Sequence, residues 1–233
     1  MIPATPQTPF IGREPLLRRL GAMFRTGKHV LLVGSKGVGK SMIVAEIART
    51  FPLLLAPRCG CLGDFLADLE PQAELARDDL KLAVRVHRLA AELPKTGRAL
   101  VLENVARVPP RVAHLVRVLL IHQPIWLVAR SVMPLDLGHV WPYLFFFQRV
   151  DVPPFSASET RAFLAAVEFD GNRAELLASA LRLHRLSAGH PGTLTSLVAE
   201  LRMRTYDLRT AEGLRLLALH ARISLVESQL AAP

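Results

Sequence analysis

The sequence predicts an α/β fold in which helices cover both faces of a parallel β-sheet (an αβα sandwich), followed by a small all-helical domain. Through the first two thirds of the chain, short apolar runs alternate with longer segments of helical periodicity. This alternation is typical of βαβ units, whose helices connect parallel strands. Beyond Pro153 and Pro154 only helical periodicity continues. We therefore predict an α/β domain over residues 1–153 and a helical domain over residues 154–233.

The predicted strands are short runs of apolar residues with little alternation between apolar and polar side chains. Such a composition suits a strand that is buried on both faces of a parallel sheet. A fifth strand is expected just before the domain boundary. The predicted strands are residues 30–33, 53–56, 99–102, 125–129 and 144–152.

Helices are predicted where apolar residues recur every three or four positions. The second of them, for example, has Ile43, Ile47 and Ala48 on one face, which is expected to point inward. The helical domain is predicted to begin with a capping box, in which Ser156 and Glu159 each satisfy a free amide of the first turn. In the α/β domain the predicted helices are one that carries Leu16, Leu17 and Leu20, and residues 41–50, 65–69, 79–93 and 111–120.

The composition excludes several classes of protein. With 233 residues, 51% of them hydrophobic and 21% charged, the chain can bury a core without disulfides or a metal, and it is not intrinsically disordered. No stretch approaches the roughly 20 apolar residues of a membrane span, and the N-terminus lacks the pattern of a signal peptide. We expect a cytoplasmic protein with no membrane partner. Cys59 and Cys61 are too close for a good disulfide and have no partners at zinc-finger spacing.

The charge of the chain is strongly positive and unevenly distributed. The net charge is +9, and residues 1–155 hold 20 of the 29 cationic side chains but only 12 of the 20 anionic ones. A basic domain attracts polyanions such as DNA, because lysine and arginine displace the counterions of the phosphate backbone. A general preference for arginine on solvated faces would give the same composition. Both interpretations remain open.

One segment carries a specific chemical signal. Residues 34–41 read Gly-Ser-Lys-Gly-Val-Gly-Lys-Ser and match the phosphate-binding pattern Gly-x4-Gly-Lys-Ser/Thr, between a predicted strand and a predicted helix. The glycines let backbone amides approach a phosphate, and the start of the helix adds its dipole. Lys40 is expected to contact the β and γ phosphates, and Ser41 to ligate Mg²⁺. The predicted phosphate-binding residues are Gly34, Ser35, Lys36, Gly37, Val38, Gly39, Lys40, Ser41 and Met42.

Two further residues follow predicted strands that neighbour this loop. Glu103 comes directly after residues 99–102 and is expected to help Ser41 hold Mg²⁺; an ordinary surface carboxylate is the alternative. Arg130 comes directly after residues 125–129, from which it could reach the γ-phosphate; a solvated arginine is the alternative. We predict that Lys40, Glu103 and Arg130 are catalytic. The chain has no Asn-Lys-x-Asp sequence, the pattern that reads guanine, so ATP is the expected nucleotide.

These residues, in this order, resemble the P-loop ATPases of the AAA+ and STAND groups. Residues 34–41 are similar to the Walker A loop, and residues 100–105 (Leu-Val-Leu-Glu-Asn-Val) to the STAND form of the Walker B strand. Residues 10–14 (Phe-Ile-Gly-Arg-Glu) resemble the entry segment that packs on adenine, and residues 189–191 (Gly-His-Pro) the GxP motif near the same base. The resemblance implies a P-loop nucleotide-binding core with a helical lid, and places Ile11 and Pro191 beside the adenine.

Two departures from the family pattern affect the expected activity. Glu103 stands where the family has Asp, and Asn104 stands where most AAA+ members have the glutamate that orients the attacking water. An amide cannot act as a general base, so nucleotide binding is better supported than fast hydrolysis.

Three functions are compatible with this pattern. The first is an ATP-dependent switch with slow hydrolysis. The second is an oligomeric, DNA-binding AAA+ ATPase of the kind that regulates replication origins or transposition. The third is a degenerate interaction module that retains the fold without hydrolysing ATP. The expected partners are accordingly ATP with Mg²⁺ and, as open alternatives, further copies of the chain, DNA or another protein.

Overall fold

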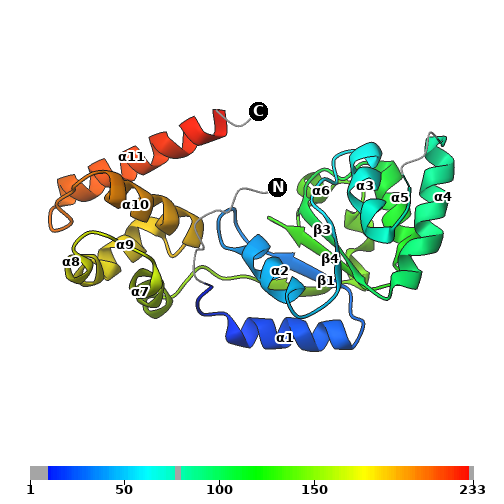
Figure 1. The fold of residues 1–233 in the computed structure, drawn as a ribbon, viewed down its shortest axis with the longest axis horizontal. Coiled ribbons are helices and arrows are strands. Elements are labelled where there is room, and N and C mark those ends of the chain that lie inside the picture. Colours follow the sequence, from blue (N-terminus) through cyan, green and yellow to red (C-terminus); the bar gives the residue numbers. More distant parts are fainter. Residues whose placement is uncertain (1–9, 77–79, 231–233) are drawn as a thin grey trace. The chain divides into compact units, whose positions relative to one another are not determined.

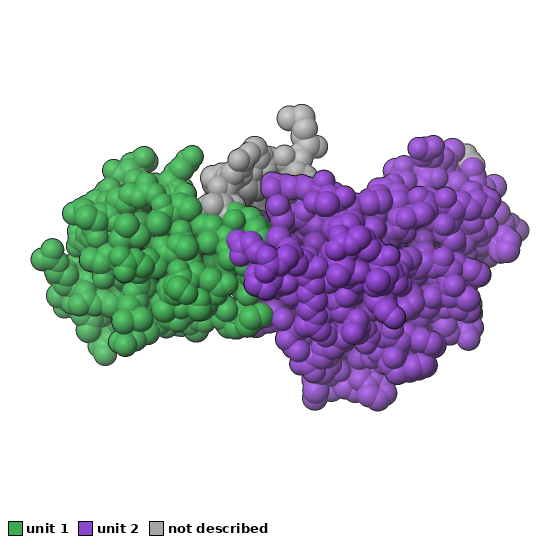
Figure 2. Space-filling model, turned by 90° about the horizontal axis from the view of Figure 1, so that it is seen from below, with its two compact units in different colours: residues 1–13, 36–39, 153–233 green, residues 14–35, 40–152 purple. Residues whose placement is uncertain are grey.

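A computed structural model describes residues 10–76 and 80–230 of the chain. The chain forms two compact units, which Figure 2 shows in different colours. Residues 14–35 and 40–152 make up an α/β unit. The helical residues from 153 onward make up the other unit, together with two short segments, residues 10–13 and 36–39. The tip of the glycine-rich loop and the residues before the first helix therefore group with the helical unit.

The α/β unit is built on a five-stranded, wholly parallel sheet of strand order β2-β3-β4-β1-β5 (Figure 1). Because β1 lies between β4 and β5, the loop that follows β1 emerges next to the carboxyl end of β4. The strands are β1 (Val30–Val33), β2 (Leu53–Ala56), β3 (Ala99–Val105), β4 (Ile125–Ala129) and β5 (Gln148–Asp151).

Helices pack on both faces of this sheet, as the uniformly apolar strands require. On one face, α3, α4 and α5 contact one another over a core that includes Leu31, Leu102 and Leu127. On the other face, Phe24 of α1 meets the ring of Trp126 edge-on, with centroids 6.3 Å apart. The helices of this unit are α1 (Glu14–Arg25), α2 (Lys40–Ala48), α3 (Leu62–Leu69), α4 (Leu82–Glu92), α5 (Pro110–Leu119) and the short α6 (Pro134–Leu137).

The predicted fold class is confirmed, and several element boundaries are corrected. The third strand continues to Val105 and therefore includes Glu103, which was expected just beyond its end. Of the segment 144–152, only residues 148–151 form a strand, because residues 141–146 wind into a 3₁₀ helix. The second helix ends at Ala48, whose side chain is exposed; Val44 is buried in its place beside Ile43 and Ile47. The predicted start of the helix 79–93 lies outside the described residues, and α4 is described from Leu82.

The helical unit has its own core, formed by leucine, valine and phenylalanine side chains from all of its helices. The predicted capping box is present: the Ser156 hydroxyl accepts from the amide of Glu159, and the Glu159 carboxylate accepts from the amide of Ser156. Its helices are α7 (Ala157–Ala166), α8 (Arg173–Ala178), α9 (Ala180–Ser187), α10 (Pro191–Met203) and α11 (Ala211–Leu230). Within the described ranges, no helix combines the length and the apolar composition that a bilayer crossing needs.

Candidate functional site

The glycine-rich loop leaves backbone amides free to bind an anion. Gly37 and Gly39 adopt positive φ angles of 81° and 95°, which other L-residues rarely adopt. Among the residues that the structure describes, none accepts a hydrogen bond from the amides of residues 36–39. Unpaired amides in a turn that leads into a helix form a cradle for a negatively charged group.

Lys40, the first residue of α2, directs its side chain back along the loop. Its ammonium group donates hydrogen bonds to the carbonyl oxygens of Gly34, 2.5 Å away, and of Ser35, 2.9 Å away. Partial burial lowers the pKa of Lys40, and the positive charge of Arg130 lowers it further. A bound phosphate would favour the charged form of Lys40, because a nearby anion raises the pKa of an ammonium group.

Ser41 and Glu103 come together in the α/β unit, although 62 positions separate them in the sequence. Burial raises the pKa of the Glu103 carboxyl, and a hydrogen-bonding interaction with the Ser41 side chain acts in the opposite direction. The Ser41 hydroxyl and the Glu103 carboxylate are both hard oxygen donors, the type of ligand that Mg²⁺ takes in proteins. The pair therefore fits a magnesium ion that is completed by phosphate and water.

The neighbouring strand ends supply Arg130 and Asn104. The amide of Gly34 donates to the carbonyl oxygen of Ala129, 3.3 Å away, so the start of the loop is joined to the residue before Arg130. Asn104 has a φ of +50°, where the pairing of β3 with β4 becomes irregular, and its side chain is exposed. Glu103 is only half-buried beside it. The edge of the sheet next to the loop thus carries a carboxylate, an amide and a guanidinium.

Other predicted residues lie in the helical unit. Ile11 packs against the apolar core of that unit. Pro191 is the first residue of α10, and the next residue, Gly192, donates its amide hydrogen to the carbonyl oxygen of Gly37, 2.8 Å away. Within the helical unit, the residue that follows the GxP segment therefore contacts the tip of the glycine-rich loop.

The remaining predicted loop residues differ in their exposure. Val38 is buried, whereas Ser35, Lys36 and Ser41 are exposed. The side chain of Met42 is 42% exposed. Because residues 35–41 are expected to bind through their amides, the exposure of Ser35 and Lys36 is compatible with that role.

Sequence reasoning missed the role of Arg13, a buried arginine in the entry segment. Its guanidinium donates a hydrogen bond to the carbonyl oxygen of Pro153, 2.6 Å away, and lies over the ring of Phe155, 5.0 Å from the centroid. Burial lowers the pKa of Arg13, and the nearby Glu159 carboxylate opposes this effect. Arg13 thus ties the start of the described chain to the segment that leads into α7. The only sequence signal for it was its place in the entry motif.

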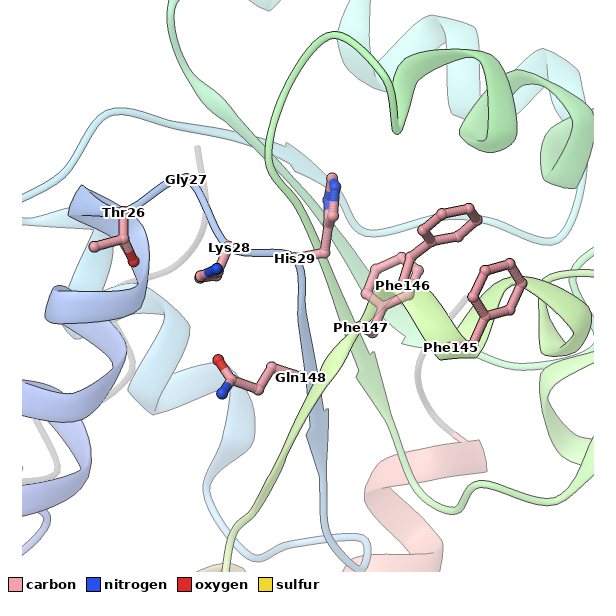
Figure 3. A pocket seen from close by; sticks show the side chains of 8 residues that line it. All are labelled: Thr26, Gly27, Lys28, His29, Phe145, Phe146, Phe147 and Gln148. Atoms are coloured by element: carbon pink, nitrogen blue, oxygen red, sulfur yellow. The ribbon is translucent and has the colours of Figure 1, made fainter.

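A pocket of about 460 Å³ lies at the opposite, amino-terminal edge of the sheet (Figure 3). Residues 26–29, just before β1, and residues 145–148, at the start of β5, line it. None of the predicted site residues belongs to this lining. Its aromatic side chains include Phe145, which is 77% exposed.

Cys59 lies beside the site, because its thiol donates a hydrogen bond to the carbonyl oxygen of Glu103, 3.5 Å away. Cys59 is buried, and this burial, with the charges of Asp68 and Glu103, raises the pKa of its thiol to about 12. Cys61 is a free thiol whose sulfur accepts from the amide of Asp64 and caps α3. In the described part of the chain, no three His, Cys, Asp or Glu side chains cluster in a way that could hold a metal ion.

Comparison with known proteins identifies the fold. No family model and no curated protein sequence matches the chain. Among solved structures it is similar to the Orc1 protein of Aeropyrum pernix in complex with DNA, with a TM-score of 0.65 and 16% identity over 96% of this chain and 68% of that one. The chain has the fold of the AAA+ P-loop ATPases. The chain is also similar to a Walker-type ATPase of Pyrococcus abyssi, with a TM-score of 0.62 and 17% identity over 97% of this chain and 77% of that one.

A STAND signal-transduction ATPase with a tetratricopeptide repeat sensor, from Pyrococcus horikoshii, is also similar. Its TM-score is 0.51 and its identity 16%, over 89% of this chain but only 32% of the other. At these identities the similarity concerns the fold alone, and the chemistry rests on the residues of this chain.

Proposed function

We propose that the chain is an ATP-binding P-loop ATPase that acts as a nucleotide-dependent switch with slow hydrolysis. One observation carries the proposal: the amides of residues 36–39 donate no hydrogen bond to any described residue, and Lys40 follows them at the start of α2. Free backbone amides and an ammonium group in consecutive residues are suited to binding a polyphosphate.

The binding roles follow from the chemistry of each group. The amides of residues 35–41 hold the phosphates, with Gly34 and Met42 at the two ends of the segment. Lys40 exchanges its two carbonyl partners for phosphate oxygens and neutralises their charge. Ser41 and Glu103 would hold Mg²⁺, which would supply charge neutralisation for the phosphates. Ile11 and Pro191 border the adenine.

The catalytic groups favour slow turnover. Arg130 senses the γ-phosphate, because its charge already acts on Lys40. Asn104 can orient a water molecule by hydrogen bonding but cannot remove its proton. Hydrolysis therefore lacks a general base at the position next to Glu103, while binding does not need one.

A switch also needs a part that responds to the nucleotide. We propose that residues 154–233 act as a lid on the nucleotide-binding domain of residues 1–153. The hydrogen bond from Gly192 to Gly37 supports this role, because Gly192 directly follows the GxP segment and its acceptor belongs to the phosphate loop. A phosphate bound at the amides of residues 36–39 would change the surroundings of that hydrogen bond.

Calorimetric titration of the whole chain with ATP, ADP and GTP, each with Mg²⁺, tests the nucleotide assignment. We expect ATP and ADP to bind with micromolar affinity, roughly −8 kcal/mol, and GTP at least about tenfold more weakly. Light scattering with and without ATP and Mg²⁺ then tests whether the nucleotide changes assembly. If calorimetry detects no heat of binding and ATP does not stabilise the folded chain, the proposal is contradicted.

A second candidate function is a DNA-binding AAA+ ATPase. The observation that favours it is the charge of residues 1–155, where 20 cationic side chains face only 12 anionic ones. The exposed Phe145 and Phe146 have ring centroids 4.0 Å apart and planes tilted by 35°, and they line the same pocket as Lys28 (Figure 3). Exposed aromatic rings and a cation on one surface are suited to nucleic-acid bases and phosphates. We expect DNA affinity to fall steeply as salt rises. No binding at low salt would remove this candidate.

A further inference from the structure

Helix α11 presents two apolar faces, and the helical unit uses only one of them. Leu217 and Ala221 are buried on the inner face, and the hydroxyl of Ser224 donates to the buried Glu200 carboxylate. His220 on the same side pairs with the hydroxyl of Tyr206 at 2.7 Å. These contacts fix how α11 is rotated against α10, so the opposite face is well defined.

The outer face of α11 is an exposed apolar stripe. Leu216, Leu219, Ile223 and Val226 are between 43% and 54% exposed. They follow one another at intervals of three, four and three residues, which is the spacing of the a and d positions of a coiled-coil heptad. A single exposed leucine is ordinary, but a continuous stripe of this kind marks a contact surface.

We propose that the stripe pairs with α11 of a second copy of this chain, in a short parallel two-helix coiled coil. With Leu216 and Ile223 at a, and Leu219 and Val226 at d, Arg222 falls at g and Glu227 at e. Both of these charged residues are exposed.

The two charges choose the parallel orientation. In a parallel pair, a residue at g lies opposite the partner's residue at e five positions later. Arg222 of each helix therefore lies opposite position 227 of the other helix. Two favourable pairs flank the seam. An antiparallel pair would instead bring g next to g and place the two Arg222 side chains together. The charge pattern therefore matches a second copy better than a helix of arbitrary sequence.

The energetics suit a weak but specific dimer. Two heptads are too short to hold two isolated peptides together, because each peptide would first have to form its helix. Here α11 is already ordered by Leu217 and Ala221, so association does not carry that entropy cost. We expect a dissociation constant in the range of about 1 to 100 μM. The dimer needs no nucleotide, so its test is independent of the proposed function.

Sedimentation velocity of the full chain without nucleotide measures the dimer. Replacing a seam residue by a carboxylate, Ile223→Glu, is expected to raise the dissociation constant about a hundredfold, because two charges would face each other in an apolar seam. Leu181→Glu is the matched control, since Leu181 is 52% exposed on α9 of the same unit, away from the stripe. Circular dichroism establishes that each variant is folded.

Charge exchange tests the parallel register. Arg222→Glu alone and Glu227→Arg alone each make both flanking pairs repulsive, and each is expected to weaken self-association about tenfold. A mixture of the two variants restores attraction in both pairs, so heterodimers are expected at wild-type affinity. A wild-type chain that stays monomeric at about 100 μM overturns the proposal. The stripe would then be a contact surface for the α/β unit, a membrane surface or a different protein. A dimer insensitive to Ile223→Glu, or a mixture without recovery, also overturns it.

Discussion

The ammonium nitrogen of Lys40 lies 2.5 Å from the carbonyl oxygen of Gly34, to which it donates a hydrogen bond. This contact occupies the cation with neutral acceptors, while burial and Arg130 lower its pKa. A phosphate stabilises the charged form far better than two carbonyl groups do.

Lys40→Ala is therefore expected to weaken ATP binding about a hundredfold, because a charge-assisted contact to phosphate is lost. Calorimetry measures the effect. Lys95→Ala is the matched control, because Lys95 is an exposed lysine whose partner is the nearby Glu92. Tight ATP binding that survives unchanged in Lys40→Ala would contradict the assignment of the loop.

Glu103→Gln is expected to separate binding from hydrolysis. The amide keeps the size of the side chain but removes the charge that would hold Mg²⁺ with Ser41. We expect ATP affinity in the presence of EDTA to change less than about threefold, and Mg²⁺-dependent phosphate release to fall by about tenfold or more. If wild type releases no phosphate at all, the non-hydrolysing interaction module becomes the better description of the chain.

The titration of Glu103 gives a separate prediction for stability without nucleotide. Its pKa is raised above the ordinary value of 4.5, chiefly by burial, so the folded chain holds this proton more tightly than the unfolded chain. The resulting stabilisation is complete below the ordinary pKa and is lost as pH rises through the folded pKa. Glu103→Gln does not titrate, so its stability relative to wild type should rise with pH across that window. Urea unfolding at several pH values measures the difference; a constant difference would contradict it.

The sequence predicted the strands at 30–33, 53–56, 99–102 and 125–129 well because nearly all of their residues are buried, whereas three of the four residues of β5 are exposed. Residues 30–33 and 125–129 are uniformly apolar, and the structure has strands at both places. The prediction from apolar composition was wrong where an apolar segment does not form a strand. The segment 141–146 is apolar but winds into a 3₁₀ helix, with Pro142 in its first turn and Phe145 exposed. A strand predicted from composition alone cannot anticipate this outcome.

The candidate site was predictable in parts. Motif spacing located the loop and Glu103, because parallel strands bring their carboxyl ends to one edge. The contact between Gly192 and Gly37 had no such signal, since it joins the first turn of α10 to a loop that lies 155 positions earlier in the sequence. Arg13 likewise became interpretable only when its acceptor, the carbonyl of Pro153, was known.

Arg13 is expected to stabilise the helical unit through its shape as well as its charge. Arg13→Ala removes a buried hydrogen bond and the contact with Phe155, at a cost of about 2–3 kcal/mol in the free energy of unfolding. Arg13→Lys should recover only part of this, because an ammonium group lacks the planar face that lies over the ring. Urea unfolding measures both variants, with the exposed Arg18→Ala as control. Full recovery by lysine would show that charge alone matters.

Gly189 of the GxP segment has a structural requirement that is independent of any nucleotide. Its φ is +71°, and a Cβ there would lie 2.3 Å from the carbonyl oxygen of Phe155, whose amide donates to the carbonyl of Gly189. Gly189→Ala should therefore lower the free energy of unfolding by at least about 2 kcal/mol, combining backbone strain with the overlap. Gly60→Ala is the control, since nothing lies within 4 Å of a Cβ at that position, and should change stability by less than about 0.5 kcal/mol. Equal stability of the two variants in urea would show that the approach of Phe155 to Gly189 does not constrain the fold. If only Gly189→Ala loses stability, this glycine is required for packing, and Pro191 is the residue of the GxP segment that is proposed to contact the nucleotide.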